Sequence, residues 1–409
     1  MFFPCYHLPR EEKYGKLWQA ALLLLSLFLF VSPFPHTQTI GDICFYSAFL
    51  IFVYFSFRFG MRVEKHNVWI VLLLFGGWAI VSSTLALDPS ASFVDFYSHF
   101  IRYLFLTVML VGFGGSRQGI IFLAWVVVVS GATFSLVSMG YFYGVLDHDF
   151  SSRLGEGLTQ WPINPMGFPM LFSLALVPPL YLNTDQCQPL KAFLIFLAVV
   201  LAVAAILTQS RATLIGLGLV QCISFWRYKK ILVGGLLLAI VFAVSVTPIA
   251  NRFAQEDKPR KALILYTIEV IKDYPVSGIG FSFDTFKDPK LIDPAKYAAR
   301  IPEPYRNKVA FLWPHNMFLD VAVRTGLVGM LLYSIFLGLM FLELVRLLRR
   351  ASRFIRDWAV ALLAALLMFV LKGVVEPVNM HLVEVVFYTI LSMLFILIKL
   401  QSLSGKGKN

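Results

Sequence analysis

Long apolar stretches recur along the whole chain and alternate with short polar ones. Most of these apolar stretches are about 18 residues or longer, which is the length of helix that crosses a lipid bilayer. The pattern predicts an all-α polytopic membrane protein with about twelve transmembrane helices. The first stretch is too long for a removed signal peptide and lacks its small-residue cleavage site, so we interpret it as a signal anchor. The predicted spans cover residues 17–35, 39–57, 68–87, 99–114, 119–146, 164–182, 192–208, 211–226, 231–249, 316–345, 357–376 and 381–399.

One polar segment, residues 250–315, is much longer than the others. It separates nine predicted spans within residues 1–249 from three within residues 316–409. Loops of this length are usually functional or disordered. Its stretch KALILYTIEVIKDY has a helical apolar period, and this period predicts an amphipathic helix that lies on a membrane surface. The apolar face of that helix would consist of Leu263, Ile264, Thr267, Ile268 and Ile271.

Composition and charge support this topology. The 409-residue chain is 58% hydrophobic and 14% charged, whereas a soluble domain carries about 25% charged residues. More than half of its 35 Lys and Arg lie in the terminal tails and in the short loops on one side. By the positive-inside rule that side is cytoplasmic, so both termini are cytoplasmic and residues 250–315 lie outside. Anionic lipid at the cytoplasmic face accounts for the net charge of +12, and no nucleic-acid partner is expected.

The sequence lacks the signatures of several enzyme classes. It contains no P-loop, no GxSxG elbow and no HExxH helix. A DHD motif at residues 147–149 resembles a metal-binding carboxylate pair, but three residues in a loop are a weak signal. The four cysteines form no pair suited to a disulfide or a metal; they are Cys5, Cys44, Cys187 and Cys222. We therefore expect neither a metal nor a cofactor.

Two arginines on the outer side are candidate anion-binding residues. Arg211 stands in a very short outer turn, where it either snorkels to lipid phosphates or forms a fixed site for an anionic ligand. Arg260 precedes the predicted amphipathic helix, and an arginine at a helix N-terminus favours phosphate. The alternative is a solvated loop arginine among Arg252, Lys258 and Lys261.

His315 opens the tenth predicted span. A histidine titrates near neutral pH and suits a general base; the alternative is a histidine that bonds the backbone at the helix start. Gly326, eleven residues later, returns to within about 20° of the same helix face. It predicts a slot beneath His315 for a lipid chain or another helix. Asp320 and Arg324, four residues apart, are interpreted as a structural ion pair.

Another polar group marks the last outer turn. Lys372 and Glu376 are four residues apart, and His381 follows them. They either line the same cavity as the arginines or neutralise one another.

Four segments together resemble the O-antigen ligase and polymerase superfamily. HNMFLDVAVRTG fits the His-x(10)-Gly pattern of O-antigen ligases, and its HN is common to the wider superfamily. SRATLIGLG resembles the family's Ser-Arg helix start. The family's loop segment, an arginine followed by a helix and a Pro-x-x-Gly-x-Gly turn, resembles RKALILYTIEVIKDYPVSGIGFSF. RLGEGLTQWPINPMG is similar to its Arg…Asn-Pro element. Ile215 and Ile264 depart from the leucine and tryptophan that some members carry.

The resemblance implies a GT-C-like glycosyltransferase of the bacterial inner membrane. Such an enzyme transfers O-antigen from undecaprenyl diphosphate to a sugar hydroxyl of lipid A–core, at the periplasmic face and with inversion. His315 would be the base, and Arg211 and Arg260 would bind the diphosphate. Its partners would be these two substrates and the lipids of the inner membrane. Secondary site residues would be Arg153, Asn316, Gly326, Lys372 and His381.

Three other functions remain open from the sequence. An O-antigen polymerase would use a glycan as acceptor, and a protein-glycosylating relative would use a protein. A lipid-linked glycan transporter would show inverted repeats and charges at the midplane of the membrane. No repeat is visible, and the polar residues cluster at the outer boundary.

Overall fold

The computed structural model describes the chain in segments: residues 12–59, 66–157, 163–184, 188–226, 258–308, 314–376, 378 and 380–406. Within these segments every regular element is a helix, as predicted. The first half contains α1 (Glu12–Val31), α2 (Gln38–Phe59), α3 (Asn67–Thr84), α4 (Pro89–Phe96), the π-helix η1 (Tyr97–Ile101), α5 (Arg102–Gly114), α6 (Arg117–Met139), the π-helix η2 (Gly140–Val145), α7 (Ile163–Asn183), α8 (Gln188–Leu207) and α9 (Arg211–Ser224). The second half contains α12 (Lys258–Asp273), the 3-10 helix η3 (Thr285–Lys287), α13 (Pro294–Ala298), α14 (Glu303–Arg306), α15 (Met317–Arg350), α16 (Arg353–Gly373) and α17 (His381–Lys406).

Most predicted spans correspond to helices. In the described part of the chain, nine helices are long and apolar enough to cross a membrane, and the apolar helices at Gly15–Val31 and Arg211–Ser224 are shorter. The predicted span at residues 231–249 lies outside the described residues. The fourth helix begins ten residues earlier than predicted, because Asp88 caps it and Pro89 occupies its first position. The chain is thus an all-α polytopic membrane protein.

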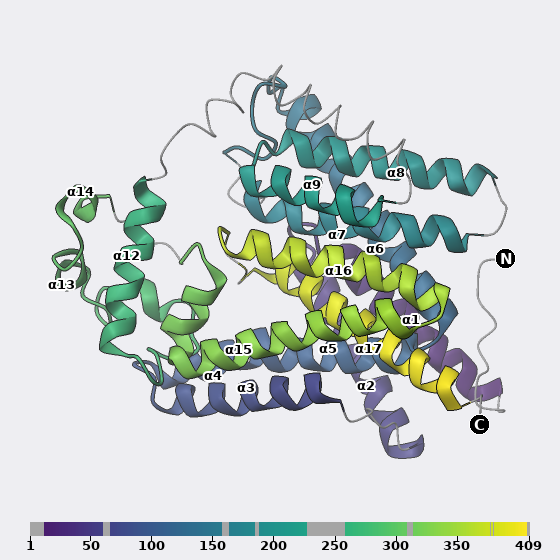
Figure 1. Ribbon diagram of the computed structural model, residues 1–409, viewed down its shortest axis with the longest axis horizontal. Helices are drawn as coiled ribbons and strands as arrows, with labels where there is room; N and C mark the ends of the chain where they lie inside the picture. Colours follow the sequence, from purple (N-terminus) through teal and green to yellow (C-terminus); the bar gives the residue numbers. More distant parts are fainter. Residues whose placement is uncertain are drawn as a thin grey trace.

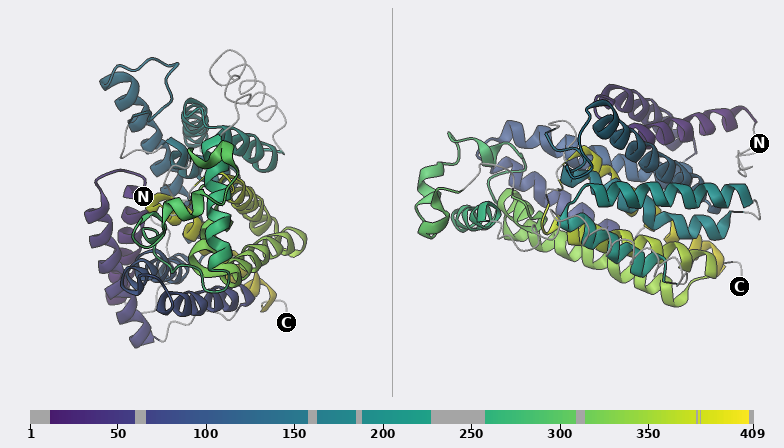
Figure 2. Two further views of the ribbon diagram at one scale, coloured as in Figure 1. Left: turned by 90° about the vertical axis from the view of Figure 1, so that its left-hand side faces the viewer. Right: turned by 90° about the horizontal axis from the view of Figure 1, so that it is seen from above.

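Most of the long helices run side by side along one axis, and the segment from α12 to α14 stands at one end of them (Figure 1). Seen from that end, α12 lies over the middle of the bundle (Figure 2). The start of α1 and the end of α17 lie at the opposite end. Helices α7 and α17 lie in the interior of the bundle, because 89% and 83% of the residues in their apolar stretches are buried. Helix α16 packs against α7, α9, α15 and α17, so its end is fixed beside the start of α9.

The amphipathic face of α12 is covered by protein, contrary to the predicted membrane-surface position. Leu263, Thr267 and Ile271 are buried, while Ile264 and Ile268 are half-buried. The face belongs to a second apolar core, separate from that of the long helices. This core also contains Tyr266, Val270, Ile279, Phe286, Ile292, Tyr297, Ala322 and Val323. A helical period shows that one face is apolar, but it does not show what covers that face.

A polar contact holds the small helices of the outer segment together. Asp273, at the end of α12, accepts hydrogen bonds from Arg300 at 2.7 Å, from Lys296 at 2.8 Å and from the Tyr297 hydroxyl at 2.9 Å. The hydrogen bonds from Arg300 and Lys296 hold the pKa of the Asp273 carboxyl well below its ordinary value. The contact therefore joins α12 to α13 at neutral pH.

Candidate active site at the outer ends of α9, α12, α15 and α16

Arg153 and Arg211 both lie at the turn between α8 and α9. Ser210 is the N-cap of α9, and its hydroxyl accepts a hydrogen bond from the Thr213 amide at 3.4 Å. Arg211 is the first residue of α9 and is half-buried. Arg153 approaches the same turn, because its Nε donates to the Thr208 carbonyl at 3.4 Å. The short turn predicted for Arg211 is therefore present, and Arg153 is its neighbour.

The end of α16 lies beneath this turn. Lys372 is fully buried; its Nζ donates to the Thr213 hydroxyl at 2.8 Å and lies 4.8 Å from the centre of the Phe168 ring. Glu376 is 2% exposed, and its Oε1 accepts from the Ser210 hydroxyl at 3.4 Å. The two residues therefore lie under the start of α9, where the arginines also lie.

Glu376 is the electrostatic centre of this group. Burial raises the pKa of the Glu376 carboxyl, and the positive charges of Lys372, Arg260 and Arg153 oppose this rise. Arg260 is in the first turn of α12 and half-buried. Its interaction with Glu376 places the start of α12 at the same corner as the α8–α9 turn. Residues far apart in the sequence thus form one group, which we call the Glu376 cluster: Arg153, Ser210, Arg211, Arg260, Lys372 and Glu376.

The start of α15, which follows His315, packs against the end of α16. The side chain of Met317, the first residue of α15, packs against Gly373 so closely that a β-carbon there would lie 2.5 Å from the Met317 sulfur. His315 is two residues before Met317, and Glu376 is three residues after Gly373. The start of α15 and the end of α16 therefore share one corner of the molecule.

Asn316 has a structural role that the sequence analysis did not assign. It is the N-cap of α15, and its Oδ1 accepts from the amides of Phe318 at 3.0 Å and Leu319 at 3.1 Å. Capping at the start of α15 is thus provided by Asn316. This observation weakens the interpretation of His315, which is half-buried, as a residue needed for the helix start.

Two predicted secondary residues lie elsewhere. His381 forms a hydrogen bond with the Tyr103 hydroxyl and packs edge-on against Phe28. It lines a separate cavity of about 220 Å³ formed mainly by the α1–α2 loop. Gly326 interrupts α15, with φ 72° and ψ 179°. The predicted slot beneath His315 assumed a continuous helix; a protein segment around Val276 occupies the space at Gly326 instead.

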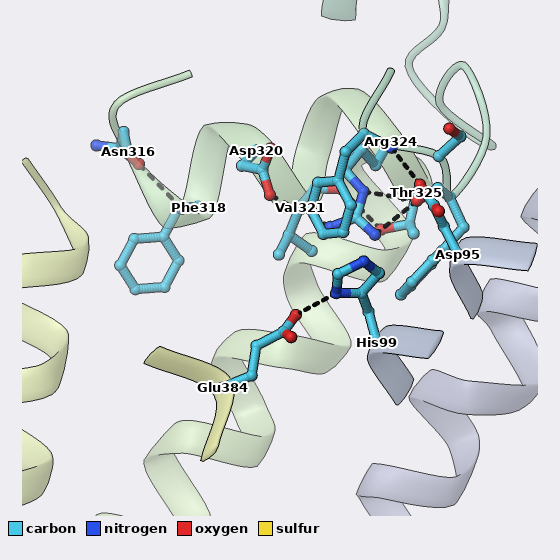
Figure 3. A network of polar contacts seen from close by, with 12 residues as sticks. Asp95, His99, Asn316, Phe318, Asp320, Val321, Arg324, Thr325 and Glu384 are labelled. Carbon is cyan, nitrogen blue, oxygen red and sulfur yellow. Dashed lines mark hydrogen bonds and ion pairs between the residues drawn. The ribbon is translucent and has the colours of Figure 1, made fainter. Parts of the chain in front are cut away.

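A second polar group lies between α15, α17 and the π-helix η1 (Figure 3). Asp320 and Arg324 form the predicted ion pair at 3.3 Å, and both are buried. His99 Nδ1 lies 2.8 Å from Glu384 Oε1. Sequence reasoning missed His99 and Glu384, although a polar residue inside an apolar span is itself a signal. The cavity between them is about 90 Å³, smaller than the cavity of about 150 Å³ that admits benzene; it is too small for a sugar ring.

The DHD motif provides no support for a metal site. Asp147 and Asp149 are exposed, and His148 stacks on Phe142 with 4.2 Å between the ring centres. Across the described residues, no group of three or more His, Cys, Asp or Glu is placed to hold a metal ion. Metal independence stays a prediction.

Residues 196–334 match a family model described as O-Antigen ligase. The chain carries an O-antigen ligase family domain. The matched range includes Arg211, Arg260 and His315, while Arg153 and Glu376 lie outside it. No curated protein matches the chain. The matched range covers about a third of the chain and is similar to the O-antigen ligase family, and the apolar helices indicate a multi-pass membrane protein.

Proposed function

We propose that the protein is an O-antigen ligase. It transfers O-antigen polysaccharide from undecaprenyl diphosphate to a sugar hydroxyl of lipid A–core at the periplasmic face of the inner membrane. One observation carries the proposal: the structure gathers Arg153, Arg260 and Lys372 around Glu376, beside Arg211 and next to the helix start that bears His315.

The chemistry of the donor explains why cations gather here. The bond between the anomeric carbon and the diphosphate oxygen breaks, and negative charge develops on the leaving diphosphate. Arginine side chains stabilise such charge through paired hydrogen bonds to phosphate oxygens. Diphosphate is already a good leaving group, so no acid is needed to protonate it. We assign this role to Arg211 and Arg260, with Arg153 as a further contact.

The acceptor hydroxyl, in contrast, needs a base that removes its proton. It is a poor nucleophile until its proton is removed, and His315 in its neutral form accepts that proton. The hydroxyl oxygen then attacks the anomeric carbon from the face opposite the diphosphate. A single displacement of this kind inverts the anomeric centre and releases undecaprenyl diphosphate.

Glu376 and Lys372 support the arginines from below. In its charged form Glu376 reduces the repulsion between Arg153 and Arg260 before the donor binds. Lys372 fixes the first turn of α9 through Thr213, and Ser210 joins that turn to Glu376. These contacts orient the helix start from which Arg211 extends.

The proposed topology follows from the charge pattern. Residues 250–315 are the periplasmic segment between the helices of residues 1–249 and those of residues 316–409. Both termini are cytoplasmic. The donor and the acceptor are both anchored in lipid, so a site at the outer membrane boundary is reachable by both.

The decisive experiment is transfer with purified protein in nanodiscs, lipid-linked glycan as donor and lipid A–core as acceptor. We expect His315→Ala to lower turnover by about 10²–10⁴-fold while donor affinity stays nearly unchanged. Arg211→Lys and Arg260→Lys should lose both affinity and turnover, because lysine keeps the charge but lacks the planar fork. Arg300→Lys, an outer arginine paired with Asp273, is the matched control and should behave as wild type.

Two results would contradict the assignment. Full activity in both lysine variants would mean that Arg211 and Arg260 do not bind the diphosphate. Product formation with a second lipid-linked glycan as acceptor, and none with lipid A–core, would identify a polymerase instead.

A further inference from the structure

Helix α15 is interrupted at Gly326, where the backbone has φ 72° and ψ 179°. A residue with a side chain rarely adopts this conformation. A β-carbon there would also collide with the carbonyl of Val276. The glycine therefore lets residues 275–283 of the outer segment lie directly against the backbone of a membrane-spanning helix.

The interruption leaves backbone groups of α15 without their helical partners, and residues 275–283 provide new ones. Polar backbone at this depth needs such partners, because lipid offers none. Three backbone hydrogen bonds join the segment to the helix: Leu327 N–H to the Pro275 carbonyl at 2.8 Å, Ile279 N–H to the Val323 carbonyl at 2.9 Å, and Gly280 N–H to the Arg324 carbonyl at 3.0 Å.

Helix α3 completes the contact from the other side. Trp78 Nε1 donates to the Thr325 carbonyl at 2.7 Å, and the Ser82 hydroxyl lies 3.0 Å from the Arg324 carbonyl. The same hydroxyl lies 2.7 Å from the Ser277 carbonyl, so it bridges the helix and the outer segment. The carbonyls next to the interruption are thus bonded by groups from two other parts of the chain.

The side chain of Arg324 makes the strongest contact with the segment (Figure 3). Its Nε and Nη2 donate to the Phe281 carbonyl at 2.9 and 2.6 Å, and its Nη1 lies 3.3 Å from Asp320 Oδ2. The guanidinium also lies 4.1 Å from the ring centre of Phe281 and 3.6 Å from that of Phe283. The planar guanidinium makes these contacts together, which the ammonium of a lysine cannot do.

This contact lies between α12, which carries Arg260, and α15, which begins two residues after His315. Helix α12 ends at Asp273, two residues before Pro275. Arg260 is thirteen residues further back, about 20 Å along a helix. A tilt of about 5° at the contact would therefore move Arg260 by roughly 2 Å. A misplacement of about 1 Å can cost about 10²-fold in rate.

We propose that Arg324 is a positioning residue. It fixes residues 275–283, and through them α12, against α15, so that Arg260 and His315 keep the separation that the transfer reaction needs. The inference rests on the proposed function, in which Arg260 binds the donor and His315 activates the acceptor. Arg324 itself contacts neither substrate in this role.

The test uses the full chain in nanodiscs, with its four cysteines replaced and spin labels at Lys258 on α12 and Leu331 on α15, both exposed. The double variant Asp320→Asn/Arg324→Met removes both buried charges, so that neither is left unpaired. Arg324→Lys keeps the charge beside Asp320 but loses the paired bonds to Phe281. Arg349→Met, at the exposed far end of α15, is the matched control.

We expect the double variant to shift or broaden the label separation by about 2 Å and to lower kcat/KM for the donor about 10²-fold. Arg324→Lys should fall between the double variant and wild type in both readouts, and Arg349→Met should match wild type. A purely structural residue would change thermal stability without moving the label separation in the folded protein.

The proposal is overturned if the double variant keeps the wild-type label separation, whatever its activity. It is also overturned if the separation changes and kcat/KM does not. A wild-type protein that transfers no glycan would instead overturn the proposed function. The two failures are therefore distinguishable.

Discussion

Replacing Gly326 with alanine should disrupt the interruption in α15. The new β-carbon would collide with the Val276 carbonyl and would sit on a backbone with φ 72°. Residues 275–283 cannot retreat freely, because Ser82 also holds the Ser277 carbonyl. Alanine therefore forces either a strained backbone or the loss of the hydrogen bonds between the segment and the helix.

The size of the effect follows from these contacts. A residue with a side chain in this region of φ and ψ costs about 1–3 kcal/mol. Three backbone hydrogen bonds join the segment to α15, and each contributes about 1 kcal/mol. Either outcome destabilises the protein by up to about 3 kcal/mol, which is a substantial share of the 5–15 kcal/mol typical of a folded domain. The melting temperature should fall by about 3–6 °C.

The same helix offers a matched control. A β-carbon on Gly338 would meet nothing within 4 Å, and alanine there should be neutral or stabilise the helix by up to about 1 kcal/mol. Thermal melts of Gly326→Ala, Gly338→Ala and wild type in nanodiscs measure the difference. Equal melting of the two variants would refute the reasoning and would mean that α15 tolerates a continuous helix at this point.

Three other predictions concern topology, metal and pH. In spheroplasts an impermeant thiol reagent should label Lys290→Cys but not Arg350→Cys; the reverse pattern would invert the topology. Transfer should survive EDTA and alanine substitution of both aspartates in residues 147–149, and a loss that a divalent cation restores would establish a metal site. The lowered pKa of Asp273 means that its contact stabilises the outer segment above about pH 4 and is lost as pH falls further. Hydrogen-exchange protection of α12 should follow that course, and Asp273→Asn should already lack it at neutral pH.

The bundle was largely predictable because lipid imposes one simple rule on the sequence. A spanning helix must be long and apolar, and such stretches are visible without any knowledge of packing. The early start of the fourth helix was also encoded, in the cap Asp88 and in Pro89. The environment of α12 was not, because an amphipathic period is equally suited to a membrane surface and to a second apolar core.

The candidate site was predictable in part. Arg211, Arg260 and His315 belong to the short motifs that carry the family resemblance, and these motifs are visible in the sequence. The proximity of the start of α15 to the end of α16 depends on long-range packing, such as the contact of Met317 with Gly373, and no local pattern encodes it. Gly326 was misinterpreted because helical periodicity assumes an unbroken helix. A glycine is needed there because the backbone at Val276 leaves no room for a β-carbon.

The two buried polar groups around α15 differ in their charge balance, and this difference separates a structural role from a binding role. Arg324 and Asp320 form an ion pair, Asp95 and Glu384 act on Arg324 as two further carboxylates, and the paired bonds of the guanidinium go to a backbone carbonyl. At Glu376 a single carboxyl is acted on by three cations. A cation among several carboxylates attracts no further anion, whereas several cations around one carboxyl attract one. A lipid-linked diphosphate, which carries negative charge on both phosphates, matches the second arrangement.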